Sequence, residues 1–408
     1  MPDTSRHRDH FDPLDPGLAE PDPTSSQGPS ETFWSTLRGM RQECPVTRSG
    51  AHGKGQWIVT RHEHVSTVAR EWGSFSSKFG AAPVAFDEGE AQFKLLPQDL
   101  DPPDHRNYRK VLNPFFGPPA VAMREQQIRD IAGEIIDAFA AQGSCEFMSS
   151  FAVTFPAQVF FRLYLGLPVA DLGDVLEWVD QMVMHPERAE EVMANFGPWI
   201  FSILEARKTE RRDDVLDAIV YEEFGGRLLT DTERIQTVLT LIIGGLETTA
   251  NAIGNAIMHL AADPALRDTV MAMDDIANAC DELLRFEAPA PGIARRCTRD
   301  TQLGDQTIAA GDRVVVYFGS ANRDADVWPD ADTIDVNRAD ARKHYSFGFG
   351  IHRCIGAHLA EAEMRVALDE LLKRMPGLRL DPAYELRWRN AFSRGPAQLR
   401  LRFDPVST

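Results

Sequence analysis

The chain has 408 residues, of which 43% are hydrophobic, and it carries a formal net charge of −18. This length and apolar content allow a large buried core, while the acidic balance argues against general nucleic-acid binding, which needs a basic surface. The five cysteines are widely spaced without a CxxC pair, which argues against a disulfide scaffold or a zinc site and favours a reduced, cytoplasmic protein.

Residues 1–29 are rich in proline, aspartate, serine and glycine. Such a segment buries too little apolar surface to offset its ordering entropy, so we expect a disordered N-terminal tail. The first residues lack the apolar stretch of a signal peptide, and no long uninterrupted apolar run indicates a membrane anchor. We therefore expect one domain over residues 30–408, located in the cytoplasm, with no nucleic-acid or membrane partner.

Helical periodicity dominates the rest of the chain, and short apolar runs between turn residues indicate a few strands. The predicted helices span residues 31–42, 62–72, 123–142, 151–165, 169–184, 189–208, 231–262, 274–286 and 354–375. The predicted strands span residues 56–60, 313–317 and 398–403. The expected fold class is mainly α with a small β component.

The helix over 231–262 has the clearest boundaries. Thr230 caps its start, Glu233 completes a capping box, and Asp263-Pro264 ends it because proline cannot continue the hydrogen-bond ladder. About thirty residues at 1.5 Å each span roughly 45 Å, the width of a whole domain. Apolar residues lie on several of its faces, so we expect this helix to be buried and to cross the centre of the protein.

A cysteine follows a glycine-rich loop in the segment FGFGIHRCIG, residues 347–356. The two glycines before Cys354 allow a tight loop, and the predicted helix that starts at the cysteine supplies free N–H groups that stabilise a thiolate. Gly356 leaves space for a flat ligand beside the helix. A thiolate held in this way suits haem iron, although a lone cysteine by itself is more often a buried structural residue.

The middle of the long helix carries the segment GGLETT, residues 244–249. Helix-interior glycines cost about 1 kcal/mol each relative to alanine, so the pair suggests that another group approaches the backbone closely. A buried acid next to a hydroxyl, Glu247 and Thr248, is costly unless it is used or satisfied. The structural alternative is a kink in which the threonine bonds back to an upstream carbonyl.

The loop over 347–356 matches the haem-binding signature of cytochromes P450, F-x-x-G-x-[HR]-x-C-x-G, at every specified position. The chain therefore resembles soluble bacterial cytochromes P450, over nearly everything from Ser30 to Phe403. This resemblance implies the P450 fold with a long central helix and haem b held by Cys354 as axial thiolate ligand, with no bound flavin. The loop residues that it assigns to cofactor binding are Phe347, Gly348, His352, Cys354 and Gly356.

The same resemblance implies roles for two other motifs. Glu247 and Thr248 match the family's acid–alcohol pair, which relays protons during oxygen activation. Glu282 and Arg285 form an ExxR motif on one helix face, and Arg338 occupies the place of the arginine that joins it. We interpret these three as a structural network that supports the cysteine loop, although an i, i+3 pair alone is usually an ordinary surface ion pair.

Haem carries two propionates, so the resemblance also implies cationic partners. His105 and Arg109 lie in the stretch DPPDHRNYR, which is similar to the family's DPPEHxxxR, and Arg295 aligns with its propionate arginine. His352 is the fourth candidate. Arginine is well suited to this task because guanidinium grips carboxylates bidentately, whereas any one of these residues alone would be read as a solvated surface group.

The sequence gives a weaker indication of the substrate. Residues expected to line the pocket are apolar or small, which favours a hydrophobic small molecule; they are Leu241, Gly244, Ala290, Ile293 and Phe392. No flavin or ferredoxin domain is attached, so we expect electrons from a separate ferredoxin and ferredoxin reductase. Basic residues that would form a docking patch for it are Arg106, Lys110, Arg342, Lys343 and Arg353.

The expected reaction is oxidation, most simply hydroxylation, of this substrate by O2. The alternative within the family is oxidative coupling, rearrangement or peroxide-driven oxidation of a natural-product intermediate. The alternatives outside the P450 family are a haem carrier or sensor and a purely helical interaction protein, neither of which needs an acid–alcohol pair.

Overall fold

The structure is a computed structural model that describes residues 30–49, 55–80, 94–390 and 393–405. The predicted tail over 1–29 and the predicted pocket residue Phe392 lie outside the described residues.

Helices make up most of the fold, as predicted. They are α1 (Ser30–Glu43), α2 (His62–Arg70), α3 (Asp104–Phe116), α4 (Pro118–Ala122), α5 (Glu125–Asp137), α6 (Thr154–Val159), α7 (Leu172–Met184), α8 (Ala189–Arg207), α9 (Val215–Tyr221), α10 (Asp231–Ala262), α11 (Pro264–Met271), α12 (Ala277–Phe286), α13 (Phe318–Ala321) and α14 (Ala357–Arg374). The strands are β1 (Val46–Ser49), β2 (Gln56–Val59), β3 (Phe75–Ser76), β4 (Ser144–Glu146), β5 (Ile293–Cys297), β6 (Thr301–Leu303), β7 (Gln306–Ile308), β8 (Arg313–Val316), β9 (Arg379–Leu380), β10 (Arg387–Asn390), β11 (Arg394–Gln398) and β12 (Arg400–Arg402).

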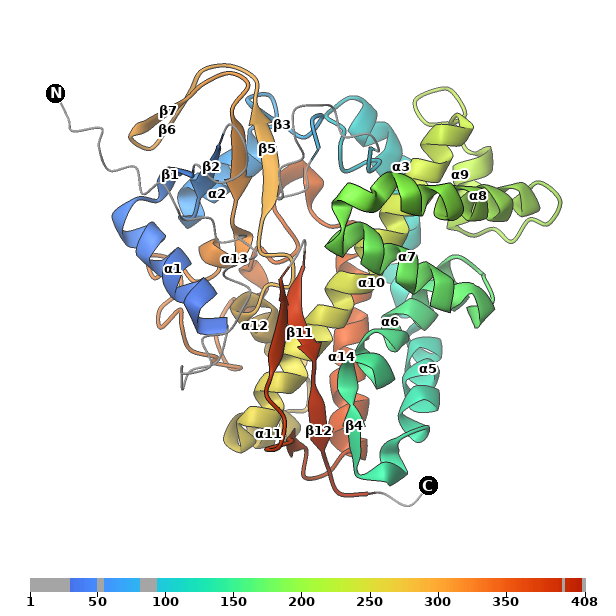
Figure 1. Ribbon diagram of the computed structural model, residues 1–408, viewed down its shortest axis with the longest axis vertical. Coiled ribbons are helices and arrows are strands. Elements are labelled where there is room, and N and C mark those ends of the chain that lie inside the picture. Colours follow the sequence, from blue (N-terminus) through green and yellow to red (C-terminus); the bar gives the residue numbers. More distant parts are fainter. Residues whose placement is uncertain (1–29, 50–54, 81–93, 391–392, 406–408) are drawn as a thin grey trace.

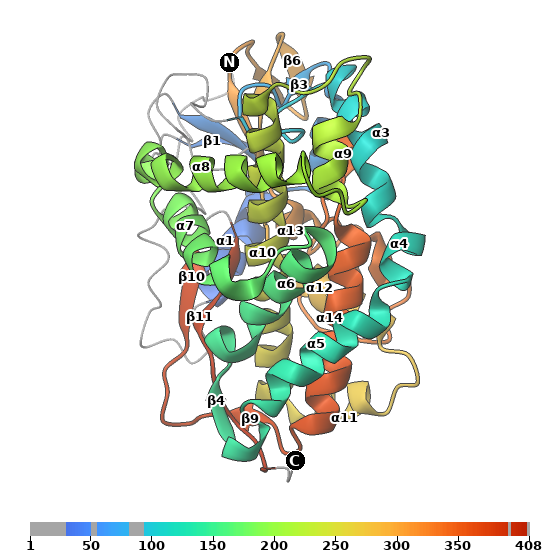
Figure 2. The same cartoon turned by 90° about the vertical axis from the view of Figure 1, so that its right-hand side faces the viewer.

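Helix α10 crosses the middle of the molecule in both views (Figures 1 and 2). Its start and end are where the sequence predicts them, with a complete capping box at Thr230 and Glu233 and the chain turning at Asp263 before Pro264. Within the described ranges, α10 is the one helix long and apolar enough to cross a membrane, but 67% of its most apolar window is buried inside the fold. It is therefore the core helix that its pattern predicts.

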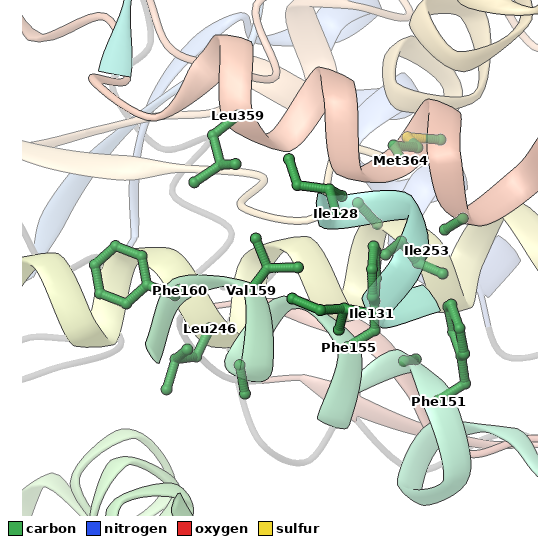
Figure 3. Close-up of a cluster of buried hydrophobic side chains, with 14 of the residues drawn as sticks. Ile128, Ile131, Phe151, Phe155, Val159, Phe160, Leu246, Ile253, Leu359 and Met364 are labelled. Carbon is green, nitrogen blue, oxygen red and sulfur yellow. The ribbon is translucent and has the colours of Figure 1, made fainter. Parts of the chain in front are cut away.

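The core lies where α10 meets α5, α6 and α14 (Figure 3). Ile131 of α5 and Phe155 of α6 pack beside Ile253 of α10, and Met364 of α14 closes the cluster. All four side chains are buried, so α10 and α14 are fixed relative to one another. This matters for the site because its main parts stand on these two helices.

The strands gather mainly on the side of the molecule opposite α5 to α9 (Figure 1). Five of them form a sheet in the order β1-β2-β8-β5-β3, in which β2 and β8 are parallel and the other neighbours are antiparallel. Strand β8 has the sequence RVVV and its three valines are fully buried, as expected for a central strand. Strand β5 carries Arg295 from this sheet toward the site.

Three element predictions need correction. The strand predicted over 398–403 includes only the last residue of β11 and the whole of β12, because the Leu399 N–H donates to the Glu146 carboxylate (2.8 Å) and the chain passes there from the β10–β11 hairpin to the β4-β12-β9 sheet. The helix predicted over 151–165 is a short α-helix, α6, between the π-helical turns Met148–Ala152 and Phe160–Tyr164. Its polar residues Thr154, Gln158 and Arg162 recur at helical spacing, but Pro156 lacks the N–H that a regular helix needs at that position. The third correction concerns α14 and belongs to the site.

Candidate functional site

The loop before Cys354 depends on glycine at two positions. Gly348 and Gly350 have φ angles of +70° and +77°, in the left-handed region that other residues avoid. A Cβ atom on Gly350 would also lie 2.3 Å from the carbonyl oxygen of Ala69, so the loop packs against the end of α2. The Cys354 N–H then donates to the Phe347 carbonyl (2.8 Å), which closes the loop.

Cys354 does not begin the helix, contrary to the prediction. Helix α14 starts at Ala357, and Gly356 precedes it as the capping residue, because the Cys354 N–H is used to close the loop. The thiol lies deep in the protein but opens into a cavity. Burial raises the pKa of this thiol, while the Gly356 N–H and the guanidiniums of Arg109 and Arg353 lower it. Donors thus lie near the sulfur, although the helix itself begins about one turn later than predicted.

One cavity brings together segments that are far apart in the sequence. Its walls come from the middle of α10, the cysteine loop, α3, β5 and the turn before β5. Most of the predicted site residues line it: His105, Arg109, Leu241, Gly244, Thr248, Ala290, Ile293, Arg295, Phe347, Gly348, His352, Cys354 and Gly356. Glu247, although it precedes Thr248 on the same helix, does not line the cavity. The predicted pocket therefore forms, with the thiol and the central helix bounding one space.

Two arginines give the cavity its positive charge. Arg295 is 4% exposed; burial lowers its pKa to about 10, and Asp101 and Asp99 oppose that shift. Its Nη1 donates to the Ala294 carbonyl (2.7 Å). Arg109 donates from Nη1 to the Arg353 carbonyl (2.8 Å) and from Nε to Asn113 (2.7 Å), which ties α3 to the cysteine loop.

Two histidines lie beside these arginines. The rings of His105 and His352 are 4.4 Å apart, and His352 Nε2 is 3.1 Å from Ser77 Oγ. Burial, reinforced by Arg295, lowers the pKa of His352 to about 2, and burial together with Arg109 lowers that of His105 to about 4. Carboxylates placed beside the two rings would oppose these shifts, so their role as cationic partners of haem stays a prediction.

These features fit a flat ligand that bears carboxylates and an iron centre. A single thiol faces the cavity, and the described residues contain no group of three or more His, Cys, Asp or Glu side chains that could hold a metal ion by themselves. His105 Nδ1 is buried without a hydrogen-bond partner among the described residues, next to the buried cation of Arg295. Gly244 presents bare helix backbone to the space. Haem matches each of these demands.

At the centre of α10, Thr248 makes the contact expected of a structural residue and also has the position expected of a functional hydroxyl. Thr248 Oγ1 donates to the Gly244 carbonyl (3.0 Å), the back-bond expected of the structural alternative, yet the side chain also lines the cavity. A Cβ atom on Gly245 would lie 3.6 Å from the Phe160 ring, an ordinary van der Waals distance, and one on Gly244 would meet no atom within 4 Å. Among the described residues, no close approach therefore requires glycine at either position, and Gly244 borders the open cavity.

The ExxR motif forms the predicted network. Arg285 donates to both oxygens of Glu282 (2.7 and 2.8 Å), and Arg338 Nε lies 3.1 Å from each of them. Glu282 and Arg285 have no exposed surface. The remaining Arg285 donors reach the carbonyls of Asn322, Ala331 and Thr333, so the network holds the irregular chain that leads to the cysteine loop.

Comparison with known proteins identifies the family to which the chain belongs. A family profile described as cytochrome P450 matches residues 187–376. The mycinamicin IV hydroxylase/epoxidase of Micromonospora griseorubida is 32% identical over 375 residues, covering 88% of this chain and 93% of that protein. The chain belongs to the cytochrome P450 family. The linalool 8-monooxygenase of Pseudomonas putida is 29% identical over 96% of this chain and 99% of its own length. The structure of a mutant of P450 EryK in complex with erythromycin B superposes with a TM-score of 0.84 at 29% identity, covering 93% of this chain and 98% of that one.

The family assignment fixes the fold and the class of chemistry. The chain is a cytochrome P450 oxidoreductase, and its family implies haem-thiolate iron. The mainly helical fold with its central α10 is the P450 fold.

Glu363 is a second acid at the cavity of this P450, and it is not among the residues predicted from the sequence. Glu363 is 2% exposed on α14, and its Oε1 has no hydrogen-bond partner among the described residues. Burial raises its pKa well above 4.5, so the acid keeps its proton to a higher pH than an exposed glutamate does. One signal was available: Glu363 stands four residues from both Leu359 and Ala367, on the apolar stripe of the predicted helix.

Replacing Glu363 with glutamine is expected to change the pH dependence of stability. The folded protein keeps the proton, whereas the unfolded chain releases it above about pH 4.5, so the wild type loses stability as pH rises from there. The loss amounts to up to ~1.4 kcal/mol per pH unit until the folded pKa is reached. Glu363→Gln removes it, so its advantage in urea unfolding should grow with pH. Parallel profiles would contradict the prediction, and Glu361→Gln, a half-exposed neighbour, is the control.

Proposed function

We propose that this P450 uses O2 to oxidise, most simply by hydroxylation, a hydrophobic small molecule at a haem b whose iron the Cys354 thiolate would hold. The observation that carries the proposal is that the Cys354 thiol, the Arg295 guanidinium and the Thr248 hydroxyl line one cavity, although they come from three distant segments. When bound, the haem supplies the centre at which oxygen is activated, and electron donation by the thiolate favours O–O cleavage.

The chain's own residues then have separable tasks. Arg295 and Arg109 would bind the two haem carboxylates, and His105 and His352, which line the same cavity, would donate hydrogen bonds to them. Thr248 holds a proton at Oγ1 beside the reacting oxygen, and Glu247 replenishes it from the far side of α10. Glu282, Arg285 and Arg338 stay out of the chemistry and keep the cysteine loop in place.

A natural-product intermediate is the proposed substrate class. Leu241, Ala290 and Ile293 line the cavity, and Phe116 and Phe160 add two rings that the sequence analysis did not include. The names of the similar proteins, which refer to mycinamicin IV, linalool and erythromycin B, support a hydrophobic compound of this kind.

We also propose a cytoplasmic protein that receives electrons from a ferredoxin and its reductase. Three residues of the predicted docking patch, Arg342, Lys343 and Arg353, line one hollow beside the cysteine loop together with Arg70. Lys110 lines a different hollow near acidic residues of α9, so it does not join the others. An acidic partner suits the smaller patch.

The spectrum of the reduced carbon monoxide complex tests the central claim. A thiolate ligand is expected to give the strongly red-shifted band of this ligation, and Cys354→Ser is expected to abolish it. Cys44→Ser, which alters a half-buried cysteine away from the cavity, is the matched control and should keep the band. If the wild type lacks the band, or if Cys354→Ser keeps it, the proposal fails.

A further inference from the structure

The acid of the α10 motif lies in an unusual environment. The side chain of Glu247 is 13% exposed and does not line the cavity. Neither of its oxygens has a well-formed hydrogen bond to the described residues. A buried carboxylate in this condition is costly, so the groups around it determine whether it carries a charge.

One cation faces Glu247, and a second acid shares it. Arg389 of β10 places Nε 3.3 Å from Glu247 Oε1, while its Nη1 lies 2.5 Å from Oδ1 of Asp180 on α7. The side chain of Asp180 is 51% exposed, that of Arg389 is 25% exposed, and that of Glu247 is 13% exposed. The arginine therefore bridges a carboxylate in contact with solvent and a carboxylate inside the protein, and it holds the outer one more closely.

The strand that carries Arg389 is fixed to the same helix as Glu247. Asn251, one turn after Glu247, donates to Ser393 Oγ (2.6 Å), and Asn255 donates to the Arg394 carbonyl (3.1 Å). A Cβ atom on Gly395 would lie 2.4 Å from Asn251 Oδ1, so β11 packs directly on α10. Because β10 pairs with β11, the position of Arg389 relative to Glu247 is set by the hairpin and not by a flexible loop.

We propose that Arg389 and Asp180 are a positioning pair for Glu247: the arginine orients the acid, and Asp180 draws the guanidinium toward itself so that the contact with Glu247 stays the longer of the two. Glu247 can then hold a proton and release it toward Thr248. The inference rests on the proposed function of Glu247 and Thr248 and adds two residues, from β10 and α7, that lie outside the α10 motif. A closer ion pair would favour the charged form of Glu247 and so oppose proton donation.

The electrostatic effects have the signs that this arrangement requires. Burial raises the pKa of Glu247 above 4.5, Arg389 and the Ser393 hydroxyl lower it, and Asp180 raises it. These are the charged and polar groups that face the acid from β10, the start of β11 and α7. Removing Arg389 or Asp180 should therefore shift the titration of Glu247 in opposite directions.

Infrared difference spectroscopy of the purified haem protein measures this titration without turnover. The carbonyl stretch of protonated Glu247 is identified as the band lost in Glu247→Gln, and its midpoint is followed against pH. Arg389→Gln is expected to raise the midpoint by about one unit or more, and Asp180→Asn to lower it, since a close opposite charge typically shifts a carboxyl by one to three units. Arg389→Lys keeps the charge and should stay near the wild type. The matched control is Arg387→Gln, two residues earlier on the same strand.

The coupling of product formation to electron consumption gives a second readout. This coupling is expected to fall as the pH rises, and the pH at which it falls should shift together with the infrared midpoint in both variants. Shifts in the same direction, shifts no larger than that of Arg387→Gln, or no band assignable to Glu247 while the protein stays folded would overturn the inference. The red-shifted carbon monoxide band separates the two failures: its presence in every variant keeps the proposed function intact, and its absence from the wild type refutes that function first.

Discussion

Glu282→Ala is expected to lower the free energy of unfolding by about 3–5 kcal/mol, because it breaks a buried ion-pair network by removing its single acid. Glu282 accepts from Arg285, from Arg338 and from the Asp335 N–H (2.9 Å), and it has no exposed surface. Its loss leaves two buried guanidiniums without the counter-charge that it supplies. Urea unfolding and haem retention on gel filtration measure the effect.

An exposed pair of the same type is the control for this prediction. Arg188 and Glu191 also stand at i, i+3, with 44% and 67% of their side chains exposed. Glu191→Ala is expected to leave the unfolding midpoint unchanged, since exposed pairs contribute little. If Glu282→Ala behaves like Glu191→Ala, the network does not hold the cysteine loop, and the Cys354 environment must be stabilised by its glycine geometry alone.

The parts of this P450 that could be predicted are those whose signals are local. Helix α10 is marked by Thr230, Glu233 and Pro264 within its own sequence, and its apolar faces predict its burial. The cysteine loop is a contiguous signature whose glycines have the positive φ angles that the pattern implies. Local rules suffice here because caps and tight turns involve neighbours in the chain.

What could not be predicted depends on contacts between distant segments. β5 pairs with β3, more than 200 residues earlier, and such partners leave no mark in either strand. The α14 start was misplaced because Cys354 donates its N–H to Phe347 instead of leaving it free. The lowered pKa of His105 follows from burial beside Arg109, which no spacing encodes.

Arg389 illustrates the same limit for function. In the sequence it is one of several arginines in the segment Leu386–Arg394, and nothing there connects it with Glu247, 142 residues earlier. The link appears once Asn251 and Asn255 dock the hairpin on α10. A motif therefore identifies the reacting acid, while the residues that set its position and its pKa become visible only in the folded protein.

Thr248→Val is expected to reduce product formed per electron consumed by on the order of 10²-fold, the lower end of what a positioned proton donor contributes. Valine keeps the shape of the side chain and removes the hydroxyl. Thr240 provides an unusually close control, because it lines the same cavity two turns earlier and its hydroxyl bonds back to the Gln236 carbonyl (2.7 Å) as Thr248 does to Gly244. If the back-bond mattered only for the helix, the two substitutions would have similar effects.

Comparing the rate of electron consumption with the rate of product formation distinguishes the two outcomes. Thr240→Val should keep both rates, Thr248→Ser should restore most of the product because it retains a hydroxyl, and Thr248→Val should continue to consume electrons while releasing peroxide. Equal loss in Thr240→Val and Thr248→Val would mean that the structural alternative is correct and that Glu247 delivers its proton by a route without Thr248. In that case the opposite titration shifts of Arg389→Gln and Asp180→Asn would still report on Glu247, since they are measured at the acid itself.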